Sequence, residues 1–140
     1  MPFNFHFLTV MHVRVLSGPR QEVTANDDIL SQVSSYDPDD VYSVQIVNIF
    51  KGKENVTQLP GLQLVGVRSP IFVIDFHTPA QWWEFCIPSL KAMKRGHEYL
   101  LSGYIEKDKL RSSYCNMRHS WASVTHQQRR GLNGKYSENC

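Results

Sequence analysis

Short β-rich runs that end at glycine, proline or acidic turn residues restrict the fold of this chain more than any other feature. Residues 7–16 and 41–50 are rich in valine, isoleucine and aromatic residues, and they are followed by Ser17-Gly18-Pro19 and Lys51-Gly52. Residues 71–76 form a third, compact apolar run. Since glycine and proline interrupt strands, we expect three strands here, the first ending at Ser17 and the third being a core strand.

The second run has the clearest alternation. A strand places every second side chain on the same face, so Tyr42, Val44, Ile46 and Phe50 are predicted to share one face.

The last two predicted strands form a hairpin. Residues 98–105 make up the first of them, with Tyr99, Leu101 and Ile105 on one side. After a turn at residues 106–108, the chain returns through residues 110–115 as the fifth strand.

The remaining segments are predicted to be loops. Residues 20–40 are polar and form a long loop with room for a short helical turn near residues 29–33. Residues 53–69 are mixed, with a turn at Pro60-Gly61, and residues 81–86 and 91–97 form an aromatic loop and a basic loop.

A short helix is predicted near the end of the chain. Residues 124–132 contain good helix formers, Ser123 is a suitable N-cap, and Arg129 and Arg130 lie near the negative end of the helix dipole. Five strands followed by one helix predict an all-β fold with short helices, namely a five-stranded Greek-key barrel of the oligonucleotide/oligosaccharide-binding (OB) type with a C-terminal helix.

Length and charge limit the classes of function. A chain of 140 residues suits one domain, covering residues 1–140. The formal net charge of +2 is too small to predict nucleic-acid binding. No apolar run approaches the roughly eighteen residues that a membrane span needs, so we expect no membrane segment.

The first residues and the cysteines favour different cellular compartments. Met1 to Leu8 lacks the basic, apolar and small-residue parts of a signal peptide, which suggests a cytosolic chain. Cys86, Cys115 and Cys140 are too far apart for a CxxC motif, and three cysteines cannot all pair with one another. Either one thiol is free, or the cysteine partners are missing.

A series of residues from Glu98 onward carries a specific resemblance. The series comprises residues 98–103, Leu110, Cys115, Asn116, Trp121, residues 127–132, Tyr136 and Cys140. It resembles, in order and nearly in spacing, the C-terminal half of the inhibitory domain of tissue inhibitors of metalloproteinases. Upstream, residues 41–52 are similar to the family's second strand, and Phe76 to Pro79, leading to Cys86, resembles the strand and loop before its next cysteine. The resemblance covers residues 8–140.

This resemblance implies a secreted, netrin-like domain that is not an enzyme and binds zinc metalloproteases of the matrix metalloproteinase type at the active-site cleft. Members of the family cap the protease zinc with the first residue of an N-terminal Cys-x-Cys. This sequence has no Cys-x-Cys, and it lacks the three cysteines that the family pairs with the positions of Cys86, Cys115 and Cys140. These three are therefore expected either to pair with a missing N-terminal segment or to remain thiols. Residues 53–69 are a second departure, since they look like an insertion.

The resemblance also places a protease-contact loop before the cysteine of the third strand. Its counterpart is predicted to comprise Trp82, Trp83, Glu84, Phe85, Cys86 and Ile87. Aromatic residues of this kind dominate protein interfaces. The alternative is that the aromatic side chains fill the mouth of the barrel.

Other candidate sites are weaker. Asn55-Val56-Thr57 is the only N-glycosylation sequon, and we expect an exposed loop there. No histidine spacing predicts zinc binding, so neither a metal nor a cofactor is expected. Six basic residues are candidates for a patch that touches sulfated glycans: Lys91, Lys94, Arg95, Lys107, Lys109 and Arg111. The alternative function is a netrin-like matrix or receptor-binding module without inhibitory action.

Overall fold

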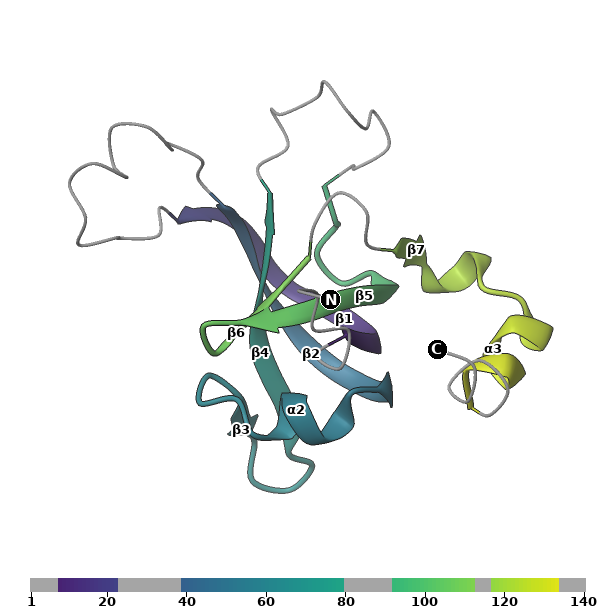
Figure 1. Cartoon of the computed structure of the whole chain (residues 1–140), viewed down its shortest axis with the longest axis horizontal. Coiled ribbons are helices and arrows are strands. Elements are labelled where there is room, and N and C mark those ends of the chain that lie inside the picture. The colour runs from purple at the N-terminus through teal and green to yellow at the C-terminus, as the bar shows by residue number, and fades with distance from the viewer. Residues whose placement is uncertain (1–7, 23–38, 80–91, 113–116, 134–140) are drawn as a thin grey trace, which may run out of the picture.

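Two long antiparallel strands form the first half of the sheet in the computed structural model, which describes residues 8–22, 39–79, 92–112 and 117–133 (Figure 1). Strand β1 spans Leu8–Glu22 and β2 spans Asp39–Lys51. They pair from Val10 opposite Lys51 to Glu22 opposite Asp39, with several register shifts on the way.

Three further strands close the sheet into a ring: β4 (Ile71–Pro79), β5 (Glu98–Glu106) and β6 (Lys109–Arg111). The neighbours β2 and β4, β5 and β6, and β1 and β5 are antiparallel, whereas β4 and β6 are parallel. The hydrogen-bonded order β1-β2-β4-β6-β5 therefore returns to β1. This order confirms the predicted five-stranded fold of the OB type.

Within the described residues, five short elements lie outside the ring. They are α2 (Lys53–Thr57), β3 (Gln63–Val65), β7 (Arg118–Ser120), the 3-10 helix η2 (Trp121–Ser123) and α3 (His126–Asn133). The segment 53–69, predicted only as mixed with a turn, thus holds a helix and a strand that pairs with β4. The entry to α2 requires glycine, because Gly52 has φ +80° and a Cβ there would lie 2.7 Å from the Leu8 carbonyl oxygen.

The core has two parts. The larger fills the ring and includes the fully buried Met11, Val13, Val44, Phe76 and Leu110. The smaller lies between the ring and α3, and consists of Leu100, Val124 and Leu132 with partly buried neighbours. The C-terminal helix is therefore attached to the ring by an apolar layer of its own.

β1 does not end at Ser17-Gly18-Pro19, as the sequence predicted, but continues to Glu22. Its pairing with β2 shifts between Val15 and Ser17 and again between Ser17 and Arg20. These irregularities accommodate Gly18, whose φ is +113°, without ending the ladder. The glycine and proline bend the strand instead of stopping it.

The prediction that Phe50 shares a face with Tyr42, Val44 and Ile46 is wrong. Val13 pairs with Ile46 and His12 pairs with Asn48, so β2 has an extra residue at Val47. One extra residue reverses the alternation of inward and outward side chains. Phe50 therefore packs in the smaller cluster, outside the ring.

The helix near the end begins three residues later than its predicted N-cap. Thr125 and Gln128 form a capping box, in which the Thr125 N–H donates to Gln128 Oε1 at 2.8 Å and the Gln128 N–H donates to Thr125 Oγ1 at 3.1 Å. The Ser123 hydroxyl donates to the Ser120 carbonyl at 2.8 Å within η2. The predicted helical turn at 29–33, the aromatic loop 81–86 and the end of the fifth predicted strand lie outside the described residues.

Candidate functional site

The predicted protease-contact loop, from Trp82 to Ile87, lies outside the described residues, and so do Cys86, Cys115 and Cys140. The structure does describe the strands and turns on both sides of this loop. The flanking residues show how the chain is attached to the ring before and after the predicted loop.

The ends of three connections meet at one edge of the ring. Pro79, the last residue of β4, pairs with Asp39 at the start of β2, and Asp39 pairs in turn with Glu22 at the end of β1. The Ser112 N–H donates to the His77 carbonyl at 2.8 Å, so the chain after β6 leaves from the same edge. We call the edge formed by Glu22, Asp39, Pro79 and Ser112 the docking edge (Figure 1).

The chain that re-enters the fold after the predicted loop is fixed at Met93. Its side chain is 3% exposed within the main core, and its N–H donates to the Tyr42 hydroxyl oxygen at 3.1 Å. Tyr42 is itself buried, and this burial raises the pKa of its phenol above the usual 10.0. The neutral phenol is therefore a fixed acceptor at physiological pH.

The turn after Met93 is fixed to two strands. The Lys94 N–H donates to the Tyr99 hydroxyl on β5 at 2.8 Å. The Gly96 N–H donates to the Val15 carbonyl on β1 at 2.8 Å, and the Val15 N–H donates to the His97 carbonyl at 3.0 Å. Both flanks of the predicted loop are thus bonded to the ring, an arrangement suited to presenting a loop on a rigid support.

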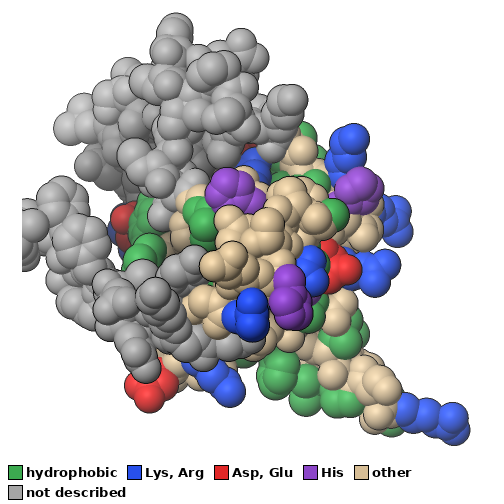
Figure 2. Space-filling view, turned by 90° about the vertical axis from the view of Figure 1, so that its right-hand side faces the viewer, with side chains coloured by type: hydrophobic (Ala, Val, Ile, Leu, Met, Phe, Trp, Pro, Cys, Tyr) green, Lys and Arg blue, Asp and Glu red, His purple; other side chains and the backbone are tan. Residues whose placement is uncertain are grey.

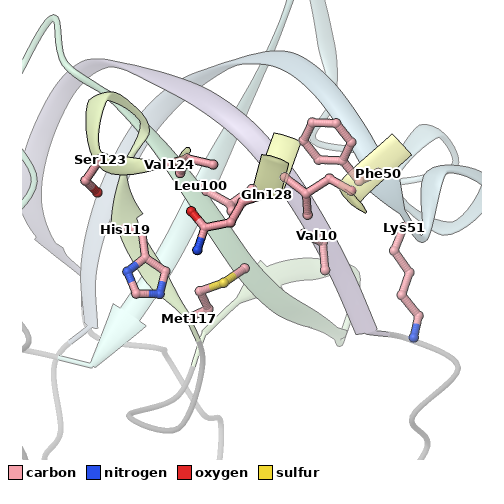
Figure 3. Close-up of a pocket in the computed structure, with 10 residues that line it drawn as sticks. Val10, Phe50, Lys51, Leu100, Met117, His119, Ser123, Val124 and Gln128 are labelled. Atoms are coloured by element: carbon pink, nitrogen blue, oxygen red, sulfur yellow. The ribbon is translucent and has the colours of Figure 1, made fainter. Parts of the chain in front are cut away.

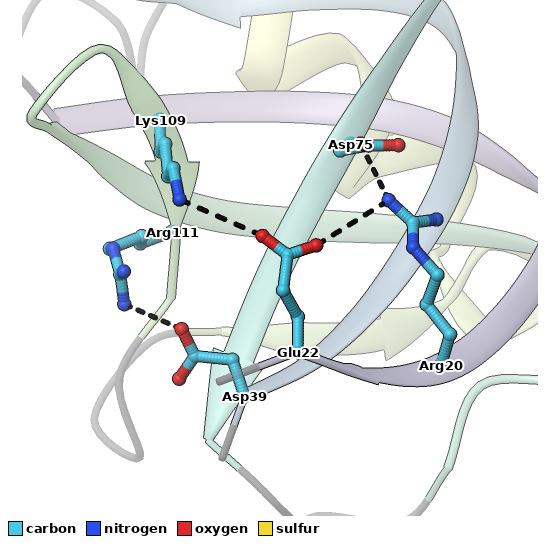
Figure 4. A network of polar contacts seen from close by, with 6 residues as sticks. All are labelled: Arg20, Glu22, Asp39, Asp75, Lys109 and Arg111. Atoms are coloured by element: carbon cyan, nitrogen blue, oxygen red, sulfur yellow. Dashed lines mark hydrogen bonds and ion pairs between the residues drawn. The ribbon is translucent and has the colours of Figure 1, made fainter. Parts of the chain in front are cut away.

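A network of charged side chains lies across the strands that form the docking edge (Figure 4). Its members are Arg20, Glu22, Asp39, Asp75, Lys109 and Arg111. The pair between Arg111 Nη1 and Asp39 Oδ2 is 2.8 Å long, and both side chains are less than one fifth exposed, at 17% and 15%. Because this pair is shielded from solvent, it joins β6 to β2 more strongly than an exposed pair would.

Of the six basic residues considered as a glycan patch, the five that the structure describes are not gathered by the fold. Lys94 and Arg95 lie just before β5, whereas Lys107 lies after its other end. Lys109 and Arg111 have acidic partners in the network, and Lys91 lies outside the described residues. On the face that carries α3, Figure 2 shows Lys and Arg side chains dispersed among other residues.

His77 is a buried histidine at the docking edge. Its side chain belongs to the buried part of β4, and burial lowers the pKa of its imidazole below 6.5. Within the described residues, no three His, Cys, Asp or Glu side chains are grouped closely enough to hold a metal ion.

Asn55 does not lie in the exposed loop that the sequence predicted. It is half-buried in α2, and its N–H donates to the Gly52 carbonyl at 3.1 Å. Val56, the middle residue of the sequon, is fully buried, and the Thr57 hydroxyl donates to the Lys53 carbonyl at 2.9 Å. The sequon is thus part of a folded helical turn.

Sequence analysis missed a cluster that attaches the C-terminal region to the ring. The rings of His12 and Trp121 stack with centroids 3.7 Å apart, and Arg129 Cζ lies 4.4 Å from the Trp121 centroid. His12 Nε2 also lies 2.6 Å from Glu98 Oε1. The residues come from β1, β5, η2 and α3, so no local pattern could have brought them together.

Comparison with known protein families gives a match that spans nearly the whole chain. The family model described as "Tissue inhibitor of metalloproteinase" matches residues 9–140. No helix in the described part of the chain is long and apolar enough to cross a membrane. The match includes the five-stranded ring, the docking edge and α3, and the chain belongs to the tissue inhibitor of metalloproteinase family.

Proposed function

We propose that this chain is a single extracellular domain, residues 1–140, that docks on the active-site cleft of a zinc metalloproteinase of the matrix type. The observation that carries the proposal is the family match over residues 9–140. The contact surface we assign is the loop Trp82–Ile87, which leaves the docking edge after Pro79 and returns before Met93.

The flanks of this loop support the assignment. A loop that binds in a cleft loses less conformational entropy when its ends are already fixed. Pro79 is paired with Asp39, and Met93 is hydrogen-bonded to Tyr42, so both ends meet this condition. Trp82, Trp83 and Phe85 would then supply large apolar contacts with few rotatable bonds.

Docking through the loop is distinct from capping the protease zinc. A catalytic zinc keeps one coordination position open, which an inhibitor fills with its own lone pairs. The loop would instead occlude the cleft beside the metal. Its contribution can therefore be measured on residues 1–140 alone, which contain no Cys-x-Cys.

Two measurements with the catalytic domain of a matrix metalloproteinase test the proposal. Biolayer interferometry reports binding, and cleavage of a quenched fluorogenic peptide reports occlusion of the active site. We expect saturable binding with competitive inhibition, and at least a tenfold weaker affinity for Trp82→Ala/Trp83→Ala, since hot-spot aromatics each contribute about 2 kcal/mol or more. Val67→Ala is the matched control, because this apolar side chain is 98% exposed and lies before the start of β4, at the end of that strand away from Pro79.

The absence of Cys-x-Cys from this sequence favours a second candidate, a netrin-like matrix or receptor-binding module without inhibitory action. Binding to the protease without competition against the peptide substrate would support this module. Absence of binding at micromolar concentrations would reject docking on the tested protease.

A further inference from the structure

A cavity of about 320 Å³ lies between the ring and the C-terminal helix (Figure 3). It is formed by residues from β1, β2, β5, β7 and the region from η2 to α3. The lining residues are Val10, Phe50, Lys51, Leu100, Met117, His119, Ser123, Val124, Gln128 and Leu132.

The lining has a clear division between apolar and polar groups. Six of the ten residues are apolar, and they include the buried Leu100, Val124 and Leu132 of the smaller core cluster. Lys51 lies at one end of the cavity and His119 and Ser123 at the other, with Gln128 between them (Figure 3). Among the lining residues that the structure describes, Lys51 alone has a permanent charge, and none is aspartate or glutamate. The charge of the cavity thus favours an anion with an apolar body.

The walls of the cavity are held by contacts on both sides. The capping box of Thr125 and Gln128 fixes the start of α3, and Trp121 packs on His12 of β1 at 3.7 Å between ring centroids. Phe50, which lines the cavity, lies 6.3 Å from Trp121 in a parallel arrangement. These contacts hold the start of α3 and the segment before it beside the cavity.

The cavity is separate from the docking edge. Val10 and Lys51 form one end of the ladder between β1 and β2, and Glu22 and Asp39 form the other end. A ligand in the cavity would therefore contact neither Pro79 nor Met93, and its binding can be tested independently of protease docking.

We propose that this cavity binds a medium-chain carboxylate, with its alkyl chain against Leu100, Val124 and Leu132 and its carboxylate near the Lys51 ammonium. A cavity of about 150 Å³ holds benzene, so one about twice as large takes a chain of roughly eight to ten carbons. Transfer of the chain from water to the apolar wall provides the affinity, and the ammonium selects the anionic head group.

Octanoate and 1-octanol are the probes for the test, and isothermal titration calorimetry with the folded 140-residue chain is the measurement. We expect both compounds to bind saturably at one site with a negative heat-capacity change, which marks burial of apolar surface. We also expect octanoate to bind more tightly than hexanoate by about twofold to fourfold for each added CH2 group. If octanoate shows no saturable binding up to millimolar concentration, the proposal is wrong.

Substitutions then locate the site. Lys51→Glu should weaken octanoate binding by about fivefold or more while leaving 1-octanol binding unchanged, because it replaces attraction with repulsion at the head group only. Lys53→Glu is the matched control: it makes the same charge change on exposed α2, outside the lining, and should change neither affinity. Equal octanoate affinities in the two variants would overturn the proposal that the carboxylate lies near the Lys51 ammonium.

A second variant tests the apolar part without touching the core. His119 is exposed on β7 and lines the cavity, so His119→Trp should occupy space in it while circular dichroism remains native. We expect both octanoate and 1-octanol to bind at least fivefold more weakly. Unchanged binding of both would show that the ligands bind elsewhere, which contradicts the proposal.

Discussion

The hydroxyl oxygen of Tyr42 accepts a hydrogen bond from the N–H of Met93 at 3.1 Å, which joins β2 to the segment that follows the predicted contact loop. Replacing Tyr42 with phenylalanine leaves this buried N–H without its acceptor. We expect Tyr42→Phe to lower the free energy of unfolding by about 1–3 kcal/mol, measured by urea denaturation. If the loop docks on a protease, the variant should also bind it more weakly, because one end of the loop loses its attachment.

Tyr99→Phe is the matched control for this experiment. It removes a hydroxyl that accepts the Lys94 N–H at 2.8 Å, but this bond is exposed and water can replace the acceptor. A loss of stability as large as that of Tyr42→Phe would show that burial of the Met93 N–H does not determine the effect.

Trp121→Ala should detach the C-terminal helix from the ring. The substitution removes the stack on His12 and the contact with Arg129, and it opens the smaller core cluster. Since Trp121 is only half-buried, we expect a loss of about 2–3 kcal/mol, below the usual cost for a fully buried tryptophan. Hydrogen exchange should show faster exchange in residues 126–133, whereas exposed His126→Ala should leave these rates unchanged.

Gly103→Ala should weaken the pairing of β5 with β6. A Cβ at this position would lie 2.5 Å from the Arg111 carbonyl oxygen and 3.3 Å from Phe76 Cε1, so the backbone of β6 would have to move. Overpacking of this kind costs about 1–3 kcal/mol. Gly61→Ala is the control, because a Cβ there has no heavy atom within 4 Å. The midpoint of thermal unfolding should be several degrees lower for Gly103→Ala than for Gly61→Ala. Equal midpoints would contradict the close approach of Gly103 to the Arg111 carbonyl.

Acidification should destabilise the fold through His12 and His77. Burial is the main cause that lowers the pKa of each imidazole below 6.5, and for His12 it outweighs the opposing hydrogen bond to Glu98. As the pH falls through 6.5, the unfolded chain therefore takes up protons at these sites before the folded chain does. The stabilisation that comes from keeping these two imidazoles neutral is therefore fully present above pH 6.5. The free energy of unfolding decreases as the pH falls below this value.

Urea denaturation between about pH 5 and pH 8 measures this dependence. The double variant His12→Gln/His77→Gln should show a smaller decrease on the acid side, whatever its stability at pH 8. His126→Gln, at an exposed position, should retain the original dependence. An unchanged slope in the double variant would exclude these two histidines as the cause.

Strand periodicity predicted the ring, because the alternation of apolar residues reflects burial of one face of each strand. Periodicity did not predict the features that depend on pairing with a strand from another part of the sequence. The bulge at Val47, which moves Phe50 out of the ring, is visible only from its register with β1. β3 is stabilised by pairing with β4, and its own three residues are all exposed. Neither feature has a local signal in the sequence.

The sequence also did not predict which residues from distant segments come together at the candidate sites. The resemblance predicted a contact loop at residues 82–87, which stays a prediction, and the structure added the bonds of Pro79 and Met93 on either side of it. The cluster of His12 and Trp121 joins residues more than one hundred positions apart, so sequence patterns could not predict it. Asn55 was predicted to lie in an exposed loop because the sequon comes just after the second strand, but the buried Val56 anchors this turn to the core.

The parallel pairing of β4 with β6 leaves every strand of the ring with hydrogen-bonded neighbours on both sides. A closed ring of strands has no unpaired edge, so the loops between its strands are not needed to cover one. We therefore expect the ring to tolerate a foreign peptide in place of the interval between Pro79 and Met93, and selection among such grafts would test whether this interval determines what the domain binds.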